Sequence, residues 1–208
     1  MRADPSLARL RRAVAIVAAL NFGYFFVEFS VALAAGSVAL LADSVDFLED
    51  TAVNALLLVA LGMTLARRAL AAKVMAGIIL IPALVAAFQV VRRLWEPDVP
   101  HVLPVLLTAS GAIVVNGVSS WLLARVHHHG GSLGRAAFLS ARNDVLVNAA
   151  IIAMALLTAW TGSGWPDVVL GVIITGLAVH AAFEVWELSE AERVDAAARE
   201  LGAGGGAE

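Results

Sequence analysis

The sequence predicts an all-α membrane protein of six transmembrane helices. Hydrophobic residues make up 61% of the 208 residues and charged residues only 15%, whereas a soluble domain is about half apolar and about a quarter charged. The mean hydropathy of +0.86 points the same way. Long runs are apolar without a break, which indicates helices, because the strands of a membrane barrel alternate apolar with polar residues.

Six apolar runs place the helices. Each is near the roughly 20 residues that a helix needs to cross about 30 Å of hydrocarbon. We expect helices at Leu10–Ala34, Val38–Ala66, Leu70–Leu94, His101–Ala124, Leu133–Trp160 and Asp167–Leu188.

Short polar or small-residue segments separate these runs. The first helix follows a basic start, and a turn at Ala35–Ser37 leads into the second, which carries acidic residues in its first half. Arginines precede the third helix, which contains Pro82, and an arginine follows the fourth. The segments His127–Ser132 and Thr161–Pro166 lead into the fifth and sixth helices.

The distribution of arginine and lysine predicts the orientation, because these residues favour cytoplasmic loops. The N-terminal segment, the turn at 67–73 and the loop at 125–135 are basic, whereas the turns at 35–37 and 161–166 carry no positive charge. With six helices, both termini are then cytoplasmic, in a multi-pass protein of the cell membrane.

This orientation divides the chain into three parts. Residues 1–9 are expected to form a cytoplasmic N-terminal segment, and residues 10–188 a six-helix transmembrane domain. Residues 189–208 form a short cytoplasmic tail, acidic and then glycine-rich, which is too short for a folded domain of its own.

The chain contains no cysteine. Disulfides and thiolate metal sites are therefore excluded, and a metal would be held by oxygen or imidazole. No G-x-x-x-x-G-K-S/T motif for nucleotide binding is present, and no nucleic-acid partner is expected.

The second predicted helix carries a row of polar residues. Ionisable side chains within a span cost about 2.5–3.5 kcal/mol each and therefore mark function. Asp43, Asp46, Asp50 and Asn54 are spaced by three, four and four, which aligns them on one helix face. Asp46 and Asp50 can thus direct two carboxylates at one ion, with Glu49 as a fourth acid nearby.

The fifth predicted helix repeats this pattern with Ser140, Asp144 and Asn148 at spacings of four. At about 1.5 Å per residue, Asp50 and Asp144 lie roughly 16–18 Å into their helices, so their depths match. Three carboxylates, those of Asp46, Asp50 and Asp144, could then converge on a divalent ion. Without metal, such buried like charges would take up protons, so metal and protons would displace each other.

A structural ion pair is the alternative. Arg142 lies two residues before Asp144 and could neutralise Glu49 or an aspartate. Such a pair accounts for one or two acids, but not for four acids and two asparagines in helical register.

The stretch Ser37–Asp50 resembles the second-helix signature of the cation diffusion facilitator (CDF) family. In that family a small-residue turn leads into an acidic pair of the form D/H-x-x-x-D. Glu28 before the turn, Asn116 in the fourth helix, the histidines at 127–129 and the six-helix layout also fit it. The resemblance covers essentially the whole chain, as a short form without the family's C-terminal cytoplasmic domain.

The resemblance implies a ligand set. Asp46 and Asp50 match the second-helix ligands and Asp144 the fifth-helix aspartate, whereas Ser140 stands where the family's H-x-x-x-D motif has histidine. Zinc favours imidazole, so an all-oxygen site suits harder ions such as manganese, or less selective transport. Asn143 could add a fourth oxygen, although from a different face than Ser140.

A further set of polar residues is expected to support these ligands without being primary among them. They are Asp43, Glu49, Asn54, Asn148 and Glu28. His127, His128 and His129 either funnel cations toward the site or form a solvated loop.

The predicted function is efflux of a divalent metal cation by alternating access, as a proton-coupled antiporter. Zinc, manganese, iron, cobalt and cadmium all remain open as the cargo, and no permanently bound cofactor is expected. The partners are the lipid bilayer, the cation and protons, with a homodimer left open.

Two other classes of protein are alternatives to a transporter. A non-transporting accessory or metal-sensing membrane protein on the same fold is the first alternative, since the family histidine is replaced. An enzyme is not expected, because no Ser–His or H-E-x-x-H arrangement lies within a span, as an intramembrane hydrolase would need.

Overall fold

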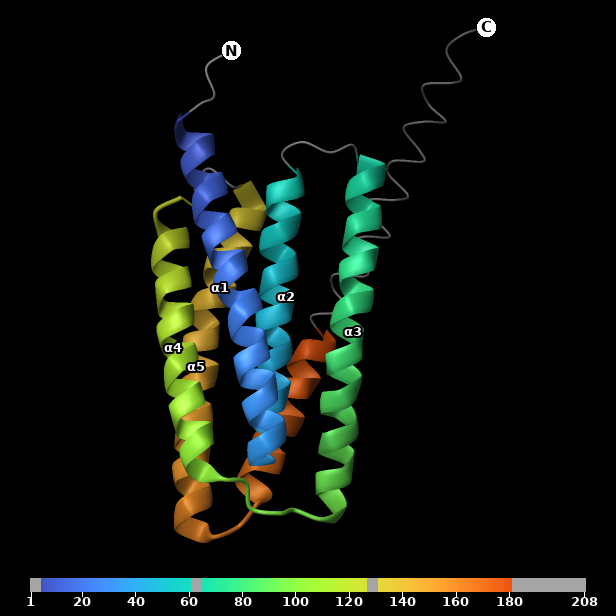
Figure 1. Cartoon of the computed structure of the whole chain (residues 1–208), viewed down its shortest axis with the longest axis vertical. Coiled ribbons are helices and arrows are strands. Elements are labelled where there is room, and N and C mark those ends of the chain that lie inside the picture. The colour runs from blue at the N-terminus through green and yellow to red at the C-terminus, as the bar shows by residue number, and fades with distance from the viewer. Residues whose placement is uncertain (1–4, 61–64, 127–130, 181–208) are drawn as a thin grey trace, which may run out of the picture.

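The computed structural model describes residues 5–60, 65–126 and 131–180, and these residues form a bundle of six helices (Figure 1). No strand occurs among them. Five helices carry labels: α1 (Pro5–Ala35), α2 (Val38–Ala60), α3 (Leu65–Trp95), α4 (Val102–Ala124) and α5 (Gly131–Thr161). A sixth, unlabelled helix is described over Trp165–His180. The predicted all-helical architecture is confirmed.

Helix α2 lies at the centre of the bundle. Consecutive helices run in opposite directions, and α3 stands at one edge beside α2 (Figure 1). Helix α2 packs against α1, α3 and α5, while α4 packs against α5 and α1. Helix α2 and its acidic side chains are therefore enclosed by other helices.

Four helices are long and apolar enough to cross a bilayer: Leu7–Ala35, Lys73–Trp95, Val102–Ala124 and Ala137–Thr161. Helix α2 misses this criterion because of its four acidic residues, and the helix at Trp165–His180 is shorter within the described chain. Large apolar side chains such as Ile81 and Phe88 are exposed on α3, as lipid contact requires. Trp95 and Trp160 are 84% exposed at helix ends, where indole rings anchor in the membrane interface.

The predicted boundary between the second and third helices is wrong. The second helix was expected to continue to Ala66 and the third to begin at Leu70, but Leu65 and Ala66 already belong to α3. Arg67 and Arg68, which suggested a turn, therefore lie in the first turns of α3. Helix α1 also begins earlier than expected, at Pro5 and not at Leu10. The end predicted at Leu188, the tail and the histidines at 127–129 lie outside the described residues.

The predicted turn between the first two helices is confirmed. Gly36 has φ +73°, which is left-handed backbone that favours glycine. Its N–H and that of Ser37 both donate to the carbonyl of Ala32, at 2.9 and 3.1 Å, in the manner of a Schellman helix end. Ser37 then caps α2, because its Oγ accepts from the N–H of Leu40 at 3.1 Å.

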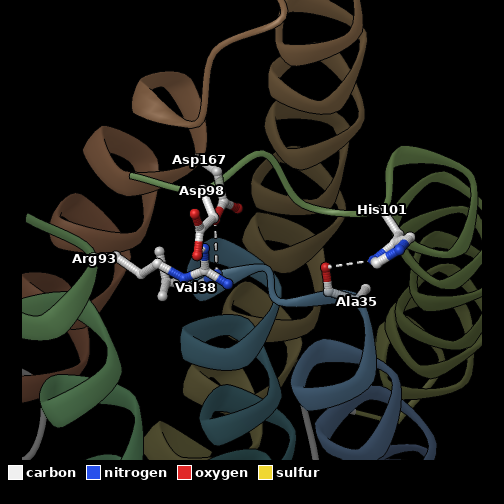
Figure 2. Close-up of polar contacts among 6 residues, drawn as sticks. All are labelled: Ala35, Val38, Arg93, Asp98, His101 and Asp167. Atoms are coloured by element: carbon white, nitrogen blue, oxygen red, sulfur yellow. Dashed lines mark hydrogen bonds and ion pairs between the residues drawn. The ribbon is translucent and has the colours of Figure 1, made fainter. Parts of the chain in front are cut away.

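A carboxylate from the far end of the sequence completes this cap. Asp167 is 1% exposed, and its side chain accepts from Ser37 Oγ at 2.6 Å, Val38 N at 2.8 Å and Ala39 N at 3.3 Å. These four residues are called the α2 cap below. Figure 2 shows Asp167 above the start of α2. An anion at a helix N-terminus satisfies free N–H groups and complements the helix dipole.

Two further contacts close the same end of the bundle. His101 donates its backbone N–H to the carbonyl of Ala35 at 2.9 Å and also places Nδ1 at 3.4 Å from it, which joins α1 to α4 (Figure 2). Arg93 pairs with Asp98, Nη1 to Oδ2, at 2.9 Å. The end of α1 is therefore linked to the start of α4, and the end of α3 to the loop that follows it.

Glycine allows the last helix to approach α2 closely. A Cβ on Gly171 would lie 2.9 Å from Cγ2 and 3.0 Å from the carbonyl carbon of Val38. Gly176, on the same helix, has open space at that position. The helix at Trp165–His180 can thus bring Asp167 to α2 only because residue 171 lacks a side chain.

We predict that Asp167→Ala destabilises the protein, because it removes the acceptor of three buried donors. Each buried group left without a partner costs about 1–3 kcal/mol. The midpoint of thermal unfolding in detergent should fall clearly. Asp98→Ala is the control, because that side chain is 69% exposed and an exposed ion pair contributes about 0–1 kcal/mol. Equal midpoints for the two variants would contradict the role of the cap.

A second prediction compares two glycines of one helix. Gly171→Ala should destabilise the protein by about 1–3 kcal/mol, because the new methyl group meets the backbone of Val38. Gly176→Ala should leave stability unchanged or raise it by up to about 1 kcal/mol, the helix-propensity difference between the residues. The same unfolding measurement checks both, and a neutral Gly171→Ala would show that the helices do not need this approach.

Candidate metal site

Asp50 is the best-connected carboxylate of α2. It is 5% exposed, and each of its oxygens accepts one hydrogen bond from another helix. Ser140 Oγ of α5 donates to Oδ1 at 2.9 Å, and Asn21 Nδ2 of α1 donates to Oδ2 at 3.1 Å. Three helices therefore meet at this side chain, and its orientation is fixed from both sides.

A small interior cavity lies next to Asp50. Its lining residues come from α2, α4 and α5: Asp43, Asp46, Phe47, Asp50, Asn116 and Asp144. Side chains fill it so closely that no space the size of a water molecule is left. The structure thus brings the three predicted ligands Asp46, Asp50 and Asp144 to one cavity, while their binding of metal stays a prediction.

Asp144 belongs to this group although it comes from α5. Its carboxyl group is a direct neighbour of that of Asp50 and is also close enough to Asp43 for their negative charges to repel each other. Two carboxylates in contact repel each other in a medium of low dielectric, unless a proton or a metal ion lies between them. The convergence expected from matching helix depths is therefore present.

Arg142 does not neutralise the cavity. Its side chain is exposed, and its guanidinium donates to Asn143 Oδ1 at 3.4 Å. Asn143 is exposed on the same side of α5 and is not among the residues that line the cavity. The structural ion pair and the fourth oxygen proposed for Asn143 are thus both placed away from the aspartates.

Asn54 and Asn148 support the two aspartate-bearing helices in the same way. Asn54 Nδ2 donates to the backbone carbonyl of Asp50 at 2.8 Å, and Asn148 Nδ2 donates to that of Asp144 at 3.0 Å. Both side chains are buried, and the Oδ1 atom of each has no hydrogen-bond partner. Glu49, in contrast, is half-buried and outside the cavity lining.

Buried oxygen acceptors without a donor recur around this region. They are Asn21 Oδ1, both oxygens of Glu28, Asp43 Oδ2, Asn54 Oδ1, Asn116 Oδ1 and Asn148 Oδ1. Each such group costs about 1–3 kcal/mol if it stays unpaired. All of them are acceptors, so a cation, a protonated neighbour or a water molecule would satisfy them.

No group of three or more His, Asp or Glu side chains is already in metal-holding geometry within the described ranges. The carboxylates share a cavity without surrounding a common point. Metal binding would therefore require rotation of side chains, which the unpartnered amide oxygens could accompany.

Comparison with known proteins identifies the family. Residues 14–188 match the family model described as the cation efflux transmembrane domain. The chain belongs to the cation efflux family. The resemblance to cation diffusion facilitators is thereby confirmed, and the matched domain is that of a family of transporters. Together with the apolar helices, it makes the chain a multi-pass protein of the cell membrane.

Two curated relatives of the cation efflux family are named zinc transporters. The zinc transporter ZitB of Escherichia coli is 28% identical over 212 residues, which cover 93% of this chain and 64% of that protein. ZitB of Pectobacterium atrosepticum is 28% identical over 185 residues, covering 81% of this chain and 57% of that protein. This chain thus spans less than two thirds of the length of these relatives.

Two residues of the site of this cation efflux protein are absent from the site residues predicted from the sequence. Asn21 donates to Asp50, and its place on the same face of α1 as Tyr24 and Glu28, at spacings of three and four, was a usable signal. Asn116 of α4 was noted only as part of the resemblance, but it lines the cavity. Nothing in the local sequence says that α4 approaches α2 at this depth.

Proposed function

We propose that this protein exports a divalent metal cation, and that Asp46, Asp50 and Asp144 are its ligands. One observation carries the proposal: carboxylates of α2 and α5 share a single buried cavity within a cation efflux chain. Ser140 contributes through Asp50, whose Oδ1 it binds at 2.9 Å. Residues 10–188 act as the transport unit.

The charge of the site favours a divalent ion. Three carboxylates in a low-dielectric interior are costly while ionised and unpaired. A divalent cation removes most of that charge, and protons removed or returned at the same groups balance the remainder. We therefore propose proton-coupled antiport, in which metal entry releases protons and proton entry releases metal.

Zinc is the first cargo to test, because the two relatives are named zinc transporters. The donor atoms of this chain nevertheless differ from a usual zinc site. The cavity is lined by carboxylates and an amide, with no histidine among the lining residues. Oxygen donors suit manganese and other harder ions, whereas imidazole suits zinc. We propose transport of zinc with weak discrimination against manganese.

Alternating access would open and close the bundle around the cavity. The end that holds the α2 cap is closed by hydrogen bonds from Asp167 to Ser37 and Val38. On the predicted orientation this end faces away from the cytoplasm. Export therefore requires that the contacts between the last helix and α2 loosen while the carboxylates hold the ion.

Asp50→Ala tests the metal site directly. In proteoliposomes with a metal-sensitive dye inside, an imposed pH gradient should drive zinc uptake by the unaltered protein. The variant should lose roughly tenfold to a hundredfold in rate, because it removes a ligand and leaves Ser140 and Asn21 without their acceptor.

Asp98→Ala serves as the control for charge removal, since Asp98 is exposed and lies outside the cavity. Unimpaired uptake by a folded Asp50→Ala protein would refute the ligand assignment. Zinc binding to the unaltered protein without any uptake would instead favour the accessory or sensing protein.

Ser140→His tests whether residue 140 determines the preference between zinc and manganese. The variant places an imidazole beside Asp50, at the position where Ser140 Oγ now lies 2.9 Å from its carboxylate. We expect zinc uptake to rise relative to manganese uptake by roughly tenfold, because imidazole prefers zinc. Competition of the two ions in the same vesicles measures the ratio. An unchanged ratio would mean that residue 140 does not face the ion.

A further inference from the structure

Glu28, which the sequence predicted only as a supporting residue, is a buried carboxylate. It lies on α1 and is 0% exposed, and neither of its oxygens receives a hydrogen bond within the part of the chain that the structure describes. A carboxylate in such surroundings needs a cation or a proton. Glu28 does not line the central cavity, so the proposed ligands do not account for it.

Two residues of other helices, Asp43 beside Glu28 and Asn148 beside Asp43, also carry an unpartnered oxygen. The carboxyl group of Asp43 on α2 is a direct neighbour of Glu28 and of the side chain of Asn148 on α5. Asp43 Oδ2 and Asn148 Oδ1 have no donor, and both residues are at most 1% exposed. Four buried acceptor oxygens, two of them from Glu28, thus come from three helices.

The chemistry of this group matches a divalent cation. Two carboxylates carry two negative charges when ionised, and the amide adds a neutral oxygen donor. Carboxylate and amide oxygens are the donors that hard divalent ions prefer. A single ion held by the two carboxylates would satisfy their unpartnered oxygens, and Asn148 could turn its amide oxygen to the same ion from its place beside Asp43.

The position of the group relates it to the central cavity. Asp43 is seven residues before Asp50, or about 10 Å along α2 toward the turn at Gly36. Asp43 also lines the central cavity, so it borders both groups. We propose that Glu28, Asp43 and Asn148 form a second binding site for the transported cation, between the central ligands and the end of the bundle that holds the α2 cap. This inference rests on the proposed function, because it concerns the same cargo.

Equilibrium dialysis of the full chain in lipid nanodiscs, with zinc and with manganese as probes, tests the second site. The double variant Asp50→Asn, Asp144→Asn removes two central ligands. We expect it to retain about one bound ion per chain, more weakly held than in the unaltered protein. Adding Glu28→Gln should abolish that binding, whereas adding Asp98→Asn should leave it unchanged. No ion in the double variant, or binding that survives Glu28→Gln, would overturn the second site.

A second measurement looks for a gain of binding, which a misfolded variant would not produce. It uses the absence of cysteine from this chain. The double variant Glu28→Cys, Asp43→Cys should bind one cadmium ion and develop the ultraviolet absorption of cadmium–thiolate bonds. Each single cysteine variant is its control and should show a clearly weaker band. A band no stronger in the double variant than in the single ones would mean that the two residues cannot hold one ion.

The two proposals fail separately. If Asp50→Ala still transports zinc, the central ligand assignment is wrong whatever Glu28 does. If Asp50→Ala abolishes transport but Glu28→Gln alters neither dialysis nor flux, the central site stands and the second site is wrong.

Discussion

Carboxylates that are buried together without a matching cationic side chain are the constraint on which this structure depends. Asp43, Asp46, Asp50 and Asp144 line one cavity, and Arg142 is directed away from it. In a bilayer such a group is stable only if it is protonated or holds a metal ion. The energetic cost of the fold and the proposed exchange of protons for metal would therefore come from the same side chains.

The rest of the bundle serves to keep these acids together and enclosed. Helix α2 is surrounded by α1, α3 and α5, and hydrogen bonds from α1 and α5 hold both oxygens of Asp50. At one end the α2 cap ties α2 to the last helix. Helix α2 is held at its end by the cap and at its middle by the hydrogen bonds to Asp50, so access to the cavity can change only if the neighbouring helices move. This restriction is suited to a carrier, whose ion site must not be open to both sides of the membrane at the same time.

Features that depend on local residue spacing could be predicted from the sequence. Contacts between residues that lie far apart in the chain could not. The row Asp43, Asp46 and Asp50 follows from helix geometry, and hydropathy alone locates the apolar helices. The α2 cap joins Asp167 to Ser37 across 130 residues, and no periodicity reports such a contact. The start of α3 at Leu65, five residues before the expected one, was missed because arginine occurs in the first turns of a helix as well as in a loop.

Ser140 shows how one substitution relative to the family pattern can alter both binding and release. Its hydroxyl donates to Asp50, so the ion would meet an aspartate already held in place by a neutral donor. A serine hydroxyl does not change its charge near neutral pH, whereas an imidazole does. In the antiport that we propose, proton exchange at the cavity would then come from the carboxylates. Their mutual repulsion would bring the protons back when the metal leaves, a role that neither Asn116 nor Phe47 of the cavity lining could take over.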